Sequence, residues 1–272
     1  MLRSTLRPVL KWAGGKRQLL PQILARLPEQ IDTYYEPFVG GGAVFFALAG
    51  SSRFKRAVLG DRNSNLMAVY QALQKEPRRV IQRLKRYQES HSEEAYYEVR
   101  EREPSSLVEK AARILYLNRT GFNGLYRVNR SGKFNVPFGR YANPRILDEP
   151  RLLAAHEALK RVQLVTGDFE EVCLGAKKGD AVYFDPPYLP VSATSSFAEY
   201  HAEAFGIAEH QRLAKVFTKL AKRGVCAVLS NSDTPDTREL FGGHRLEIVS
   251  ARRSINSKHE RRGPVREILA ST

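Results

Sequence analysis

The sequence predicts an α/β fold built on a doubly wound, mostly parallel sheet. Short apolar runs that are typical of buried strands alternate along the chain with longer segments of helical periodicity. Several of the predicted strands end in glycine or in an acidic residue, which is typical of the ligand-binding edge of such a sheet. A stretch in the middle of the chain breaks this alternation and predicts an inserted domain.

The first part of the chain carries two predicted strands. A helical pattern follows the turn Gly14-Gly15-Lys16, and a strand over 33–39 leads through Gly40-Gly41-Gly42 into a helix from Ala43. A second strand, over 56–61, ends in an acid.

The middle of the chain has a different pattern. Residues 64–117 are predicted to be mostly helical, with breaks at Pro77 and Pro104, because proline lacks the amide hydrogen that a helix interior uses. Residues 127–136 predict a β-hairpin with turn residues at Ser131-Gly132.

Strand and helix alternate again toward the C-terminus. An apolar-faced helix is predicted over 211–221, and strands are predicted over 162–165, 180–184, 225–229, 245–249 and 264–269. We therefore expect one α/β domain formed by residues 1–66 and 144–272, with an inserted domain over 67–143.

The charge balance points to a polyanionic partner. The chain of 272 residues has 44 Lys and Arg against 29 Asp and Glu, a formal net charge of +15. From Lys110 to Leu147 the chain carries no acidic residue, and aromatic and Asn residues alternate with the cations. Aromatic and amide side chains among cations suit contact with bases as well as phosphates, and a solvated basic surface is the alternative.

Composition also argues against several classes of protein. The two cysteines, Cys173 and Cys226, form no CxxC pair, and no apolar stretch approaches the ~20 residues of a membrane span. The N-terminus lacks the pattern of a signal peptide, and the six His have no metal-ligand spacing. We expect a cytoplasmic protein with no membrane segment and no metal site.

The glycine turn after the first strand predicts a cofactor site. Glycine lets the backbone approach a ligand closely, and the helix that follows offers free amides at its N-terminus. Asp61 ends the next strand about 20 residues further on, where an acid holds the ribose of an adenosine-containing cofactor. A simple tight connection is the alternative. The chain lacks GxGxxG here, and Gly15-Lys16 does not belong to a triphosphate-binding loop.

The segment Asp185-Pro186-Pro187-Tyr188 predicts a receptor for an amino group. The prolines remove amide donors, so that nearby carbonyls are available as acceptors beside the carboxylate. An amino group has two N–H bonds to donate to such a pair, and the tyrosine offers a flat surface for a ring. The alternative is a proline-rich turn in which the acid only caps the backbone.

These motifs together resemble the Dam-type DNA adenine-N6 methyltransferases, in that family's order and over nearly the whole chain. The matching segments are 10–16, 36–40, 61–63, 118–127, 134–141, 167–169, 185–188 and 230–234. The segments FNGLYR at 122–127 and FNVPFG at 134–139 are the most restrictive. The motif at 185–188 alone would admit other amino-group methyltransferases.

The resemblance implies a fold, an activity and a domain division. The fold would be a Rossmann-like methyltransferase sheet with an inserted, mostly helical DNA-recognition domain that carries a β-hairpin. Residues 1–66 and 144–272 would form the catalytic domain that binds S-adenosylmethionine, and residues 67–143 would recognise the target DNA. The activity would be site-specific methylation of adenine N6 by base flipping, with GATC as the expected site.

The resemblance also assigns the catalytic and cofactor-binding residues. The catalytic residues would be Asp185, Pro186, Pro187 and Tyr188. Contacts with S-adenosylmethionine would come from Trp12, Lys16, Glu36, Phe38, Gly40, Gly42, Asp61, Asp168, Phe169 and Asp185. Among these, Asp61 would hold the ribose, and Asp168 with Phe169 would hold the adenine ring.

A further set of residues would contact DNA. Its members are Arg119, Phe122, Asn123, Leu125, Arg127, Asn129, Asn135, Pro137 and Arg140. Arg127 resembles an arginine that reads guanine, with a phosphate contact as the alternative. Phe122 resembles an aromatic that wedges into the base stack.

The expected partner is double-stranded DNA, and the expected state in solution is a monomer. A cognate restriction endonuclease would be a functional partner, not a physical one. Two other functions stay open, namely an adenine methyltransferase that acts on another DNA site or on RNA, and a DNA-binding protein without catalysis. One departure from the family pattern, Phe205-Gly206, predicts a poorer helix cap than the usual Ser or Thr.

Overall fold

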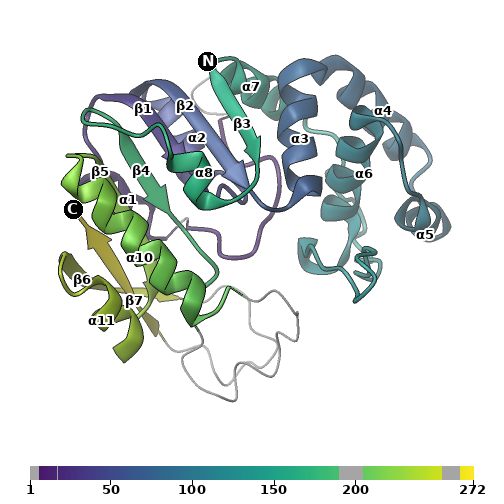
Figure 1. The fold of residues 1–272 in the computed structure, drawn as a ribbon. Coiled ribbons are helices and arrows are strands. Elements are labelled where there is room, and N and C mark those ends of the chain that lie inside the picture. The colour runs from purple at the N-terminus through teal and green to yellow at the C-terminus, as the bar shows by residue number, and fades with distance from the viewer. Residues whose placement is uncertain (1–5, 17, 190–204, 253–263) are drawn as a thin grey trace. The chain divides into compact units, whose positions relative to one another are not determined.

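The computed structural model describes residues 6–16, 18–189, 205–252 and 264–272 of the chain. Helices and strands alternate along it (Figure 1). The elements of the first half are α1 (Leu20–Arg26), β1 (Ile31–Glu36), α2 (Ala43–Gly50), β2 (Phe54–Asp61), α3 (Ser64–Lys75), α4 (Pro77–Glu89), α5 (Glu93–Glu101), α6 (Leu107–Thr120) and the short 3-10 helix η2 (Phe122–Gly124). Those of the second half are α7 (Glu149–Leu159), β3 (Val162–Thr166), α8 (Phe169–Cys173), β4 (Ala181–Phe184), α10 (Ile207–Lys222), β5 (Cys226–Ser232), α11 (Pro235–Phe241), β6 (Arg245–Arg252) and β7 (Pro264–Ser271).

The strands form one seven-stranded sheet in the order β3-β2-β1-β4-β5-β7-β6. Strands β1, β4 and β5 pair in parallel, whereas β7 pairs antiparallel with both β5 and β6. The predicted α/β class is confirmed. The C-terminal pair departs from a parallel arrangement because only residues 253–263 join β6 to β7, and a parallel crossover needs a dozen or more residues.

The chain divides into two compact units. Unit 1 consists of Met1–Gly15, Val39–Ser52 and Leu59–Gly167, and unit 2 consists of Lys16–Phe38, Arg53–Val58 and Asp168–Thr272. This division follows compactness alone and says nothing about which segments read DNA. The predicted domains, 1–66 with 144–272 and 67–143, therefore stay a prediction.

Unit 1 contains four consecutive helices whose starts follow from sequence. Side chains of Asn63, Ser92 and Ser106 accept hydrogen bonds from the first turns of α3, α5 and α6, as N-caps do. Pro77 occupies the first turn of α4, and the predicted breaks at Pro77 and Pro104 are confirmed. Helix α6 packs against α3, α4 and α5, which lie beside it in Figure 1.

The predicted hairpin at 127–136 is only partly formed, without regular strands. One isolated antiparallel bridge joins Val128 to Phe134, and the amide of Gly132, which has φ of +76°, donates to the Asn129 carbonyl over 2.9 Å. Further support comes from the helices, because the buried Tyr96 of α5 donates from its hydroxyl to the Val136 carbonyl over 2.9 Å. The loop is therefore held by a few backbone hydrogen bonds together with side-chain anchors.

Unit 2 holds the buried strands that carry the acidic strand end at Asp185. All four residues of β4 are buried, and β4 pairs in register with β5 from Ala181 to Phe184. Helix α10 packs on β5, and its N-cap residue, Gly206, provides no side-chain cap, as the sequence predicted. Among the described residues, no helix is long and apolar enough to cross a membrane.

The left-handed glycine at the start of α2 gives a prediction about stability. Gly42 has φ of +71°, and a Cβ there would lie 2.9 Å from the Tyr70 hydroxyl. Gly224 has the same φ, but the nearest atom to its Cβ position is 3.6 Å away. Gly224→Ala should cost roughly 1–2 kcal/mol of unfolding free energy for the left-handed backbone alone, and Gly42→Ala should cost more. Urea unfolding of both variants checks this, and equal losses would contradict it.

Candidate active site and nucleic-acid interface

The acidic residue at the end of β4 lies in a polar cluster within unit 2. A carboxylate oxygen of Asp185, Oδ1, lies 2.8 Å from the Lys16 ammonium and accepts a 3.2 Å hydrogen bond from the Ser230 hydroxyl. Tyr183 places its hydroxyl 2.9 Å from that of Ser230. The side chain of Lys16 is only 8% exposed and that of Asp185 is 20% exposed, so this ion pair is largely withdrawn from water.

Two opposing effects act on the Asp185 carboxyl. Burial raises its pKa above the ordinary value, because a low-dielectric surrounding disfavours the charged form. Lys16, by its charge and hydrogen bond, and Ser230, by its hydrogen bond, lower the pKa again. The carboxylate is thus partly desolvated and yet supported in its ionised form.

The prolines and tyrosine that follow complete this strand end. Pro186 is buried, Pro187 is exposed, and Tyr188 is half-buried. The Lys16 ammonium lies over the Tyr188 ring, 4.7 Å from its centroid, as in a cation–π contact. The Tyr188 hydroxyl donates to Glu267 of β7 over 2.7 Å, and burial raises the pKa of this phenol well above its usual range.

The segment after Tyr188 is held by the end of β5. The side-chain carbonyl of Asn231 accepts from the Leu189 amide over 3.2 Å, and the Ser232 hydroxyl donates to the Leu189 carbonyl over 2.7 Å. The motif at 230–234 contributed to the resemblance without a role for its members. The structure shows that Ser230, Asn231 and Ser232 support the strand end that carries Asp185.

A cluster of rings and charges lies elsewhere in unit 2. The rings of Phe38 and Phe169 stack with centroids 5.5 Å apart, and Phe205 meets both of them edge-on. Arg212 of α10 was not predicted as a site residue from the sequence. Its guanidinium carbon lies over the Phe169 ring, 4.2 Å from the ring centroid. Its guanidinium also grips both carboxylate oxygens of Asp168, over 2.8 and 2.6 Å.

Glu36, the last residue of β1, is buried in unit 2. Its carboxylate accepts a 2.8 Å hydrogen bond from the Tyr34 hydroxyl. Burial and the Glu36 charge raise the pKa of that phenol well above its usual range, so the tyrosine stays a donor.

The glycine turn and Asp61 come together within unit 1. The Asp61 carboxylate accepts from the Gly40 amide over 3.1 Å and from the Asn63 amide over 2.9 Å. Burial raises the pKa of Asp61, and these two backbone bonds lower it. The Gly40 carbonyl in turn accepts from the Tyr70 hydroxyl over 2.8 Å. Trp12 lies against the turn, since a Cβ on Gly40 would come within 3.0 Å of its indole.

The chemistry of the Asp61 carboxylate and of the phenylalanine rings fits an adenosine-containing cofactor. Each Asp61 oxygen accepts one backbone bond, and a carboxylate oxygen has a further lone pair with which it could accept from a ribose hydroxyl. The three phenylalanines of unit 2 offer flat apolar surface of the kind on which an adenine ring packs.

Most residues that the sequence assigned to DNA lie in one part of unit 1. The amide of Phe122 donates to the Pro137 carbonyl over 2.9 Å, which places 121–127 alongside 134–139. The Phe122 ring is 50% exposed. Asn123, Pro137 and Arg140 are also exposed, Leu125 is half-buried, and both Asn123 and Arg140 have a left-handed backbone.

Arg127 is exposed and oriented by one neighbour. Its Nε donates to the Asn135 side chain over 2.8 Å and its Nη2 to the Asn135 carbonyl over 3.0 Å. A guanidinium carries five N–H groups, so both hydrogens of Nη1 and one of Nη2 remain for a ligand.

Two of the assigned residues use their side chains inside the protein. The Asn129 side-chain oxygen accepts from the amides of Ser131 and Lys133, each over 3.0 Å, and so organises the hairpin turn. Arg119 donates to the Val9 carbonyl over 2.7 Å, and burial lowers the pKa of its guanidinium.

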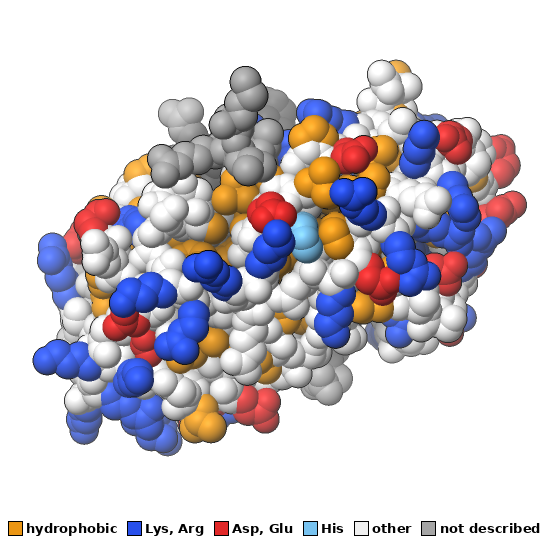
Figure 2. Space-filling model, turned by 90° about the horizontal axis from the view of Figure 1, so that it is seen from above, with side chains coloured by type: hydrophobic (Ala, Val, Ile, Leu, Met, Phe, Trp, Pro, Cys, Tyr) orange, Lys and Arg blue, Asp and Glu red, His pale blue; other side chains and the backbone are white. Residues whose placement is uncertain are grey.

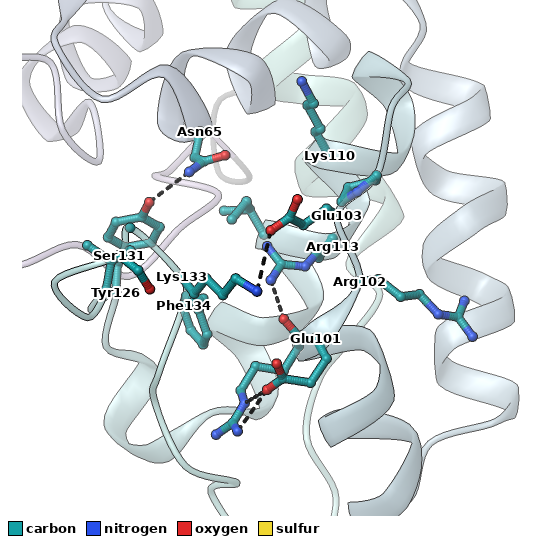
Figure 3. A pocket seen from close by; sticks show the side chains of 15 residues that line it. Asn65, Glu101, Arg102, Glu103, Lys110, Arg113, Tyr126, Ser131, Lys133 and Phe134 are labelled. Atoms are coloured by element: carbon teal, nitrogen blue, oxygen red, sulfur yellow. Dashed lines mark hydrogen bonds and ion pairs between the residues drawn. The ribbon is translucent and has the colours of Figure 1, made fainter.

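Unit 1 also has a pocket of about 410 Å³ beside the hairpin (Figure 3), which the sequence did not predict. Its lining includes the cations Arg100, Lys110 and Lys133, together with Asn65 and Tyr126, which bond to each other. On the face that Figure 2 shows, Lys and Arg side chains are spread widely, and Asp and Glu side chains lie beside several of them.

Comparison with known proteins identifies the family to which the chain belongs. The chain matches the family model of D12 class N6 adenine-specific DNA methyltransferases over residues 12–255. It is 42% identical to the Type II methyltransferase M1.LlaDCHI of Lactococcus lactis subsp. cremoris, over 99% of this chain and 96% of the relative. It is also 42% identical to the Type II methyltransferase M.MjaIII of Methanocaldococcus jannaschii, over 94% of this chain and 95% of the relative.

A third relative is the DNA adenine methylase of Escherichia coli strain K12. The identity is 37% over 97% of this chain and 94% of that relative. Because the family model spans most of the chain and the relatives align over nearly their full lengths, the chain belongs to the D12 class N6 adenine-specific DNA methyltransferases, enzymes whose substrate is DNA.

Proposed function

We propose that this enzyme transfers a methyl group from S-adenosylmethionine to N6 of the adenine in GATC, on double-stranded DNA. An adenine inside a duplex is out of reach, so the target base must first be flipped out of the stack. The observation that carries the proposal is the desolvated carboxylate of Asp185, supported by Lys16 and Ser230 and followed by two prolines.

Asp185 would receive the amino group of the flipped adenine. Lys16 and Ser230 both bond to Oδ1, which leaves Oδ2 without a partner among the described residues. One N–H of the amino group would donate to this carboxylate and the other to the Pro186 carbonyl. Two acceptors at these positions draw the nitrogen from planar toward tetrahedral and free its lone pair for reaction.

The carboxylate need not act as a strong base. The nitrogen becomes acidic once it has gained the methyl group, so a carboxylate of modest basicity can take its proton. Placement and the exclusion of water would supply most of the acceleration. Lys16 lies over one face of the Tyr188 ring, and the opposite face would stack on the flipped base.

S-adenosylmethionine supplies an electrophilic methyl group on a sulfonium. Asp61 would hold its ribose, and Phe38 with Phe169 would pack on its adenine ring. Asp168 would act mainly through Arg212, which already engages both oxygens of its carboxylate. Trp12, Lys16, Glu36, Gly40 and Gly42 would shape the remainder of the donor site, as the family resemblance implies.

Arg127 would read the guanine of the site. Its free Nη hydrogens match the two major-groove acceptors of guanine, while Asn135 keeps the guanidinium in place. The exposed Phe122 ring would fill the stack beside the flipped base, with Leu125 and Pro137 as apolar base contacts. Asn123 and Arg140 would contact DNA directly, whereas Asn129 and Arg119 would support the loop from inside.

The cellular role follows from this activity. We infer that the enzyme is a monomer that acts on DNA in the cytoplasm. It is either a bacterial enzyme at the nucleoid or a phage-encoded one. The names of two relatives suggest a role in restriction and modification. An endonuclease partner would then share the DNA site and need not bind this enzyme.

The first prediction concerns the reaction itself. Labelled methyl from S-adenosylmethionine should enter a duplex with GATC, but not a scrambled duplex or one already methylated on both strands. Asp185→Ala should abolish incorporation and yet remain folded and bind DNA, because it removes the acceptor of the amino group. Incorporation into the scrambled duplex would keep the chemistry and discard the site. Incorporation into no DNA would point to RNA or to binding without catalysis.

The second prediction concerns pH. If ionised Asp185 is required, kcat falls as the pH drops through the pKa of this group, which burial has raised. Lys16→Met removes a cation that lowers that pKa, so the acidic limb of the kcat profile should move to higher pH.

The control for this experiment is Lys55→Met. Lys55 pairs with Asp32 at the surface and should leave the limb in place. A limb that stays unmoved in Lys16→Met would mean that the ionisation of Asp185 does not limit the reaction.

The third prediction concerns sequence reading. Arg127→Ala should lose roughly 1–3 kcal/mol of discrimination at the first base of the site, measured as kcat/KM on duplexes that differ only there. Arg130→Ala, a neighbouring exposed arginine, should leave this discrimination unchanged. If Arg127→Ala instead weakens binding equally on all sequences, with a shallower salt dependence, the residue contacts a phosphate.

A further inference from the structure

Tyr126, which immediately precedes Arg127, is the centre of a contact network within unit 1. Its ring stacks on Trp12 with centroids 5.0 Å apart and planes inclined by 30°. The edge of the Phe134 ring faces it at 5.8 Å, and its hydroxyl accepts from the Asn65 side chain over 3.0 Å (Figure 3). No role was assigned to Tyr126 from the sequence.

The indole of Trp12 also packs on the glycine turn. A Cβ at Gly40 would lie 3.0 Å from Trp12 Cδ1, and one at Gly41 would lie 3.3 Å from Trp12 Cβ. Gly40 is the residue whose amide donates to Asp61. The same side chain therefore touches the loop that carries Arg127 and the turn assigned to the methyl donor.

Asn118 of α6 holds the backbone on both sides of the stack. Its side-chain oxygen accepts from the Lys11 amide, and its side-chain nitrogen donates to the carbonyls of Lys11 and Gly124, each over 2.8 Å. Asn118 is buried, so these bonds are shielded from water. The backbones next to Trp12 and near Tyr126 therefore share one anchor.

We propose that Tyr126 is a positioning residue that couples recognition of the DNA site to binding of the methyl donor, through its stack on Trp12. When Arg127 engages its base, the position of Tyr126 determines where Trp12 presses on the glycine turn. The coupling is reciprocal, so cognate DNA should tighten donor binding by the same factor as the donor tightens binding of cognate DNA. This inference rests on the proposed function, in which Arg127 reads the site and the glycine turn holds the donor.

The test compares donor affinity with and without DNA. The probe is S-adenosylhomocysteine, which lacks the transferable methyl group, titrated calorimetrically alone, with a GATC duplex and with a scrambled duplex. In the wild-type enzyme the GATC duplex should tighten binding at least about fivefold, the lower end of usual coupling. Tyr126→Leu should bring this ratio close to one, with binding of S-adenosylhomocysteine alone nearly unchanged.

Two variants separate positioning from structure. Tyr126→Phe keeps the ring and loses only the bond to Asn65, so it should retain the coupling. Tyr97→Leu removes a half-buried tyrosine from α5, where the ring packs on Arg100, and should also retain it. If Tyr126→Leu loses its native circular dichroism, Tyr126→Met keeps the apolar volume without the ring and takes its place.

The chain has a single tryptophan, so its tryptophan fluorescence reports on the surroundings of Trp12. The GATC duplex should change the Trp12 emission of the wild type and of Tyr126→Phe, but not that of Tyr126→Leu. Undiminished coupling in Tyr126→Leu overturns the proposal, and so does a wild type that binds S-adenosylhomocysteine equally well with either duplex. A wild type that binds no S-adenosylhomocysteine at all, or whose own affinity for the GATC duplex is no higher than for the scrambled duplex, refutes the proposed function itself.

Discussion

A largely buried ion pair between Lys16 and Asp185 governs the strand end to which we assign the chemistry. Removing one partner of such a pair typically costs about 3–5 kcal/mol, because the remaining charge is left in a low-dielectric site. Neighbouring residues stabilise the buried carboxylate further, because Ser230 donates to it and the Tyr183 hydroxyl lies beside that of Ser230. A carboxylate that accepts from an amino group must be partly dry and still charged, and this cluster meets both demands.

The loop over residues 121–140 of unit 1, to which we assign DNA recognition, has the opposite problem, because it contains little regular structure. Isolated bridges and a few backbone hydrogen bonds join its two arms, and they form no continuous ladder among the described residues. Side chains add further support, with Asn118, Tyr96 and Asn129 each binding backbone groups of the loop or of the segment beside it. An arginine that reads a base needs such a stiff support, since a mobile guanidinium would lose entropy on every binding event.

Several side chains of ligand-binding type turn out to be used within the protein. The Asp168 carboxylate accepts hydrogen bonds from Arg212, and Arg119 donates to a backbone carbonyl. Such residues influence a ligand through the groups that they hold in place. Ser230 and Asn231 likewise lie one strand away from the motif at 185–188 and support this segment through hydrogen bonds.

The amino-acid sequence by itself determined the α/β class, the helix breaks at Pro77 and Pro104 and the family, because strand periodicity, proline and glycine act over a few residues. The motif at 185–188 could also be identified from the sequence, since it consists of four consecutive residues. Only the tertiary structure decided which partners the polar groups take. Lys16 meets Asp185, Asn118 meets Lys11, and Arg212 meets Asp168 across long stretches of chain, and no local pattern encodes such pairings. The packing of distant segments selects them, as it selects the contact of Tyr126 with Trp12.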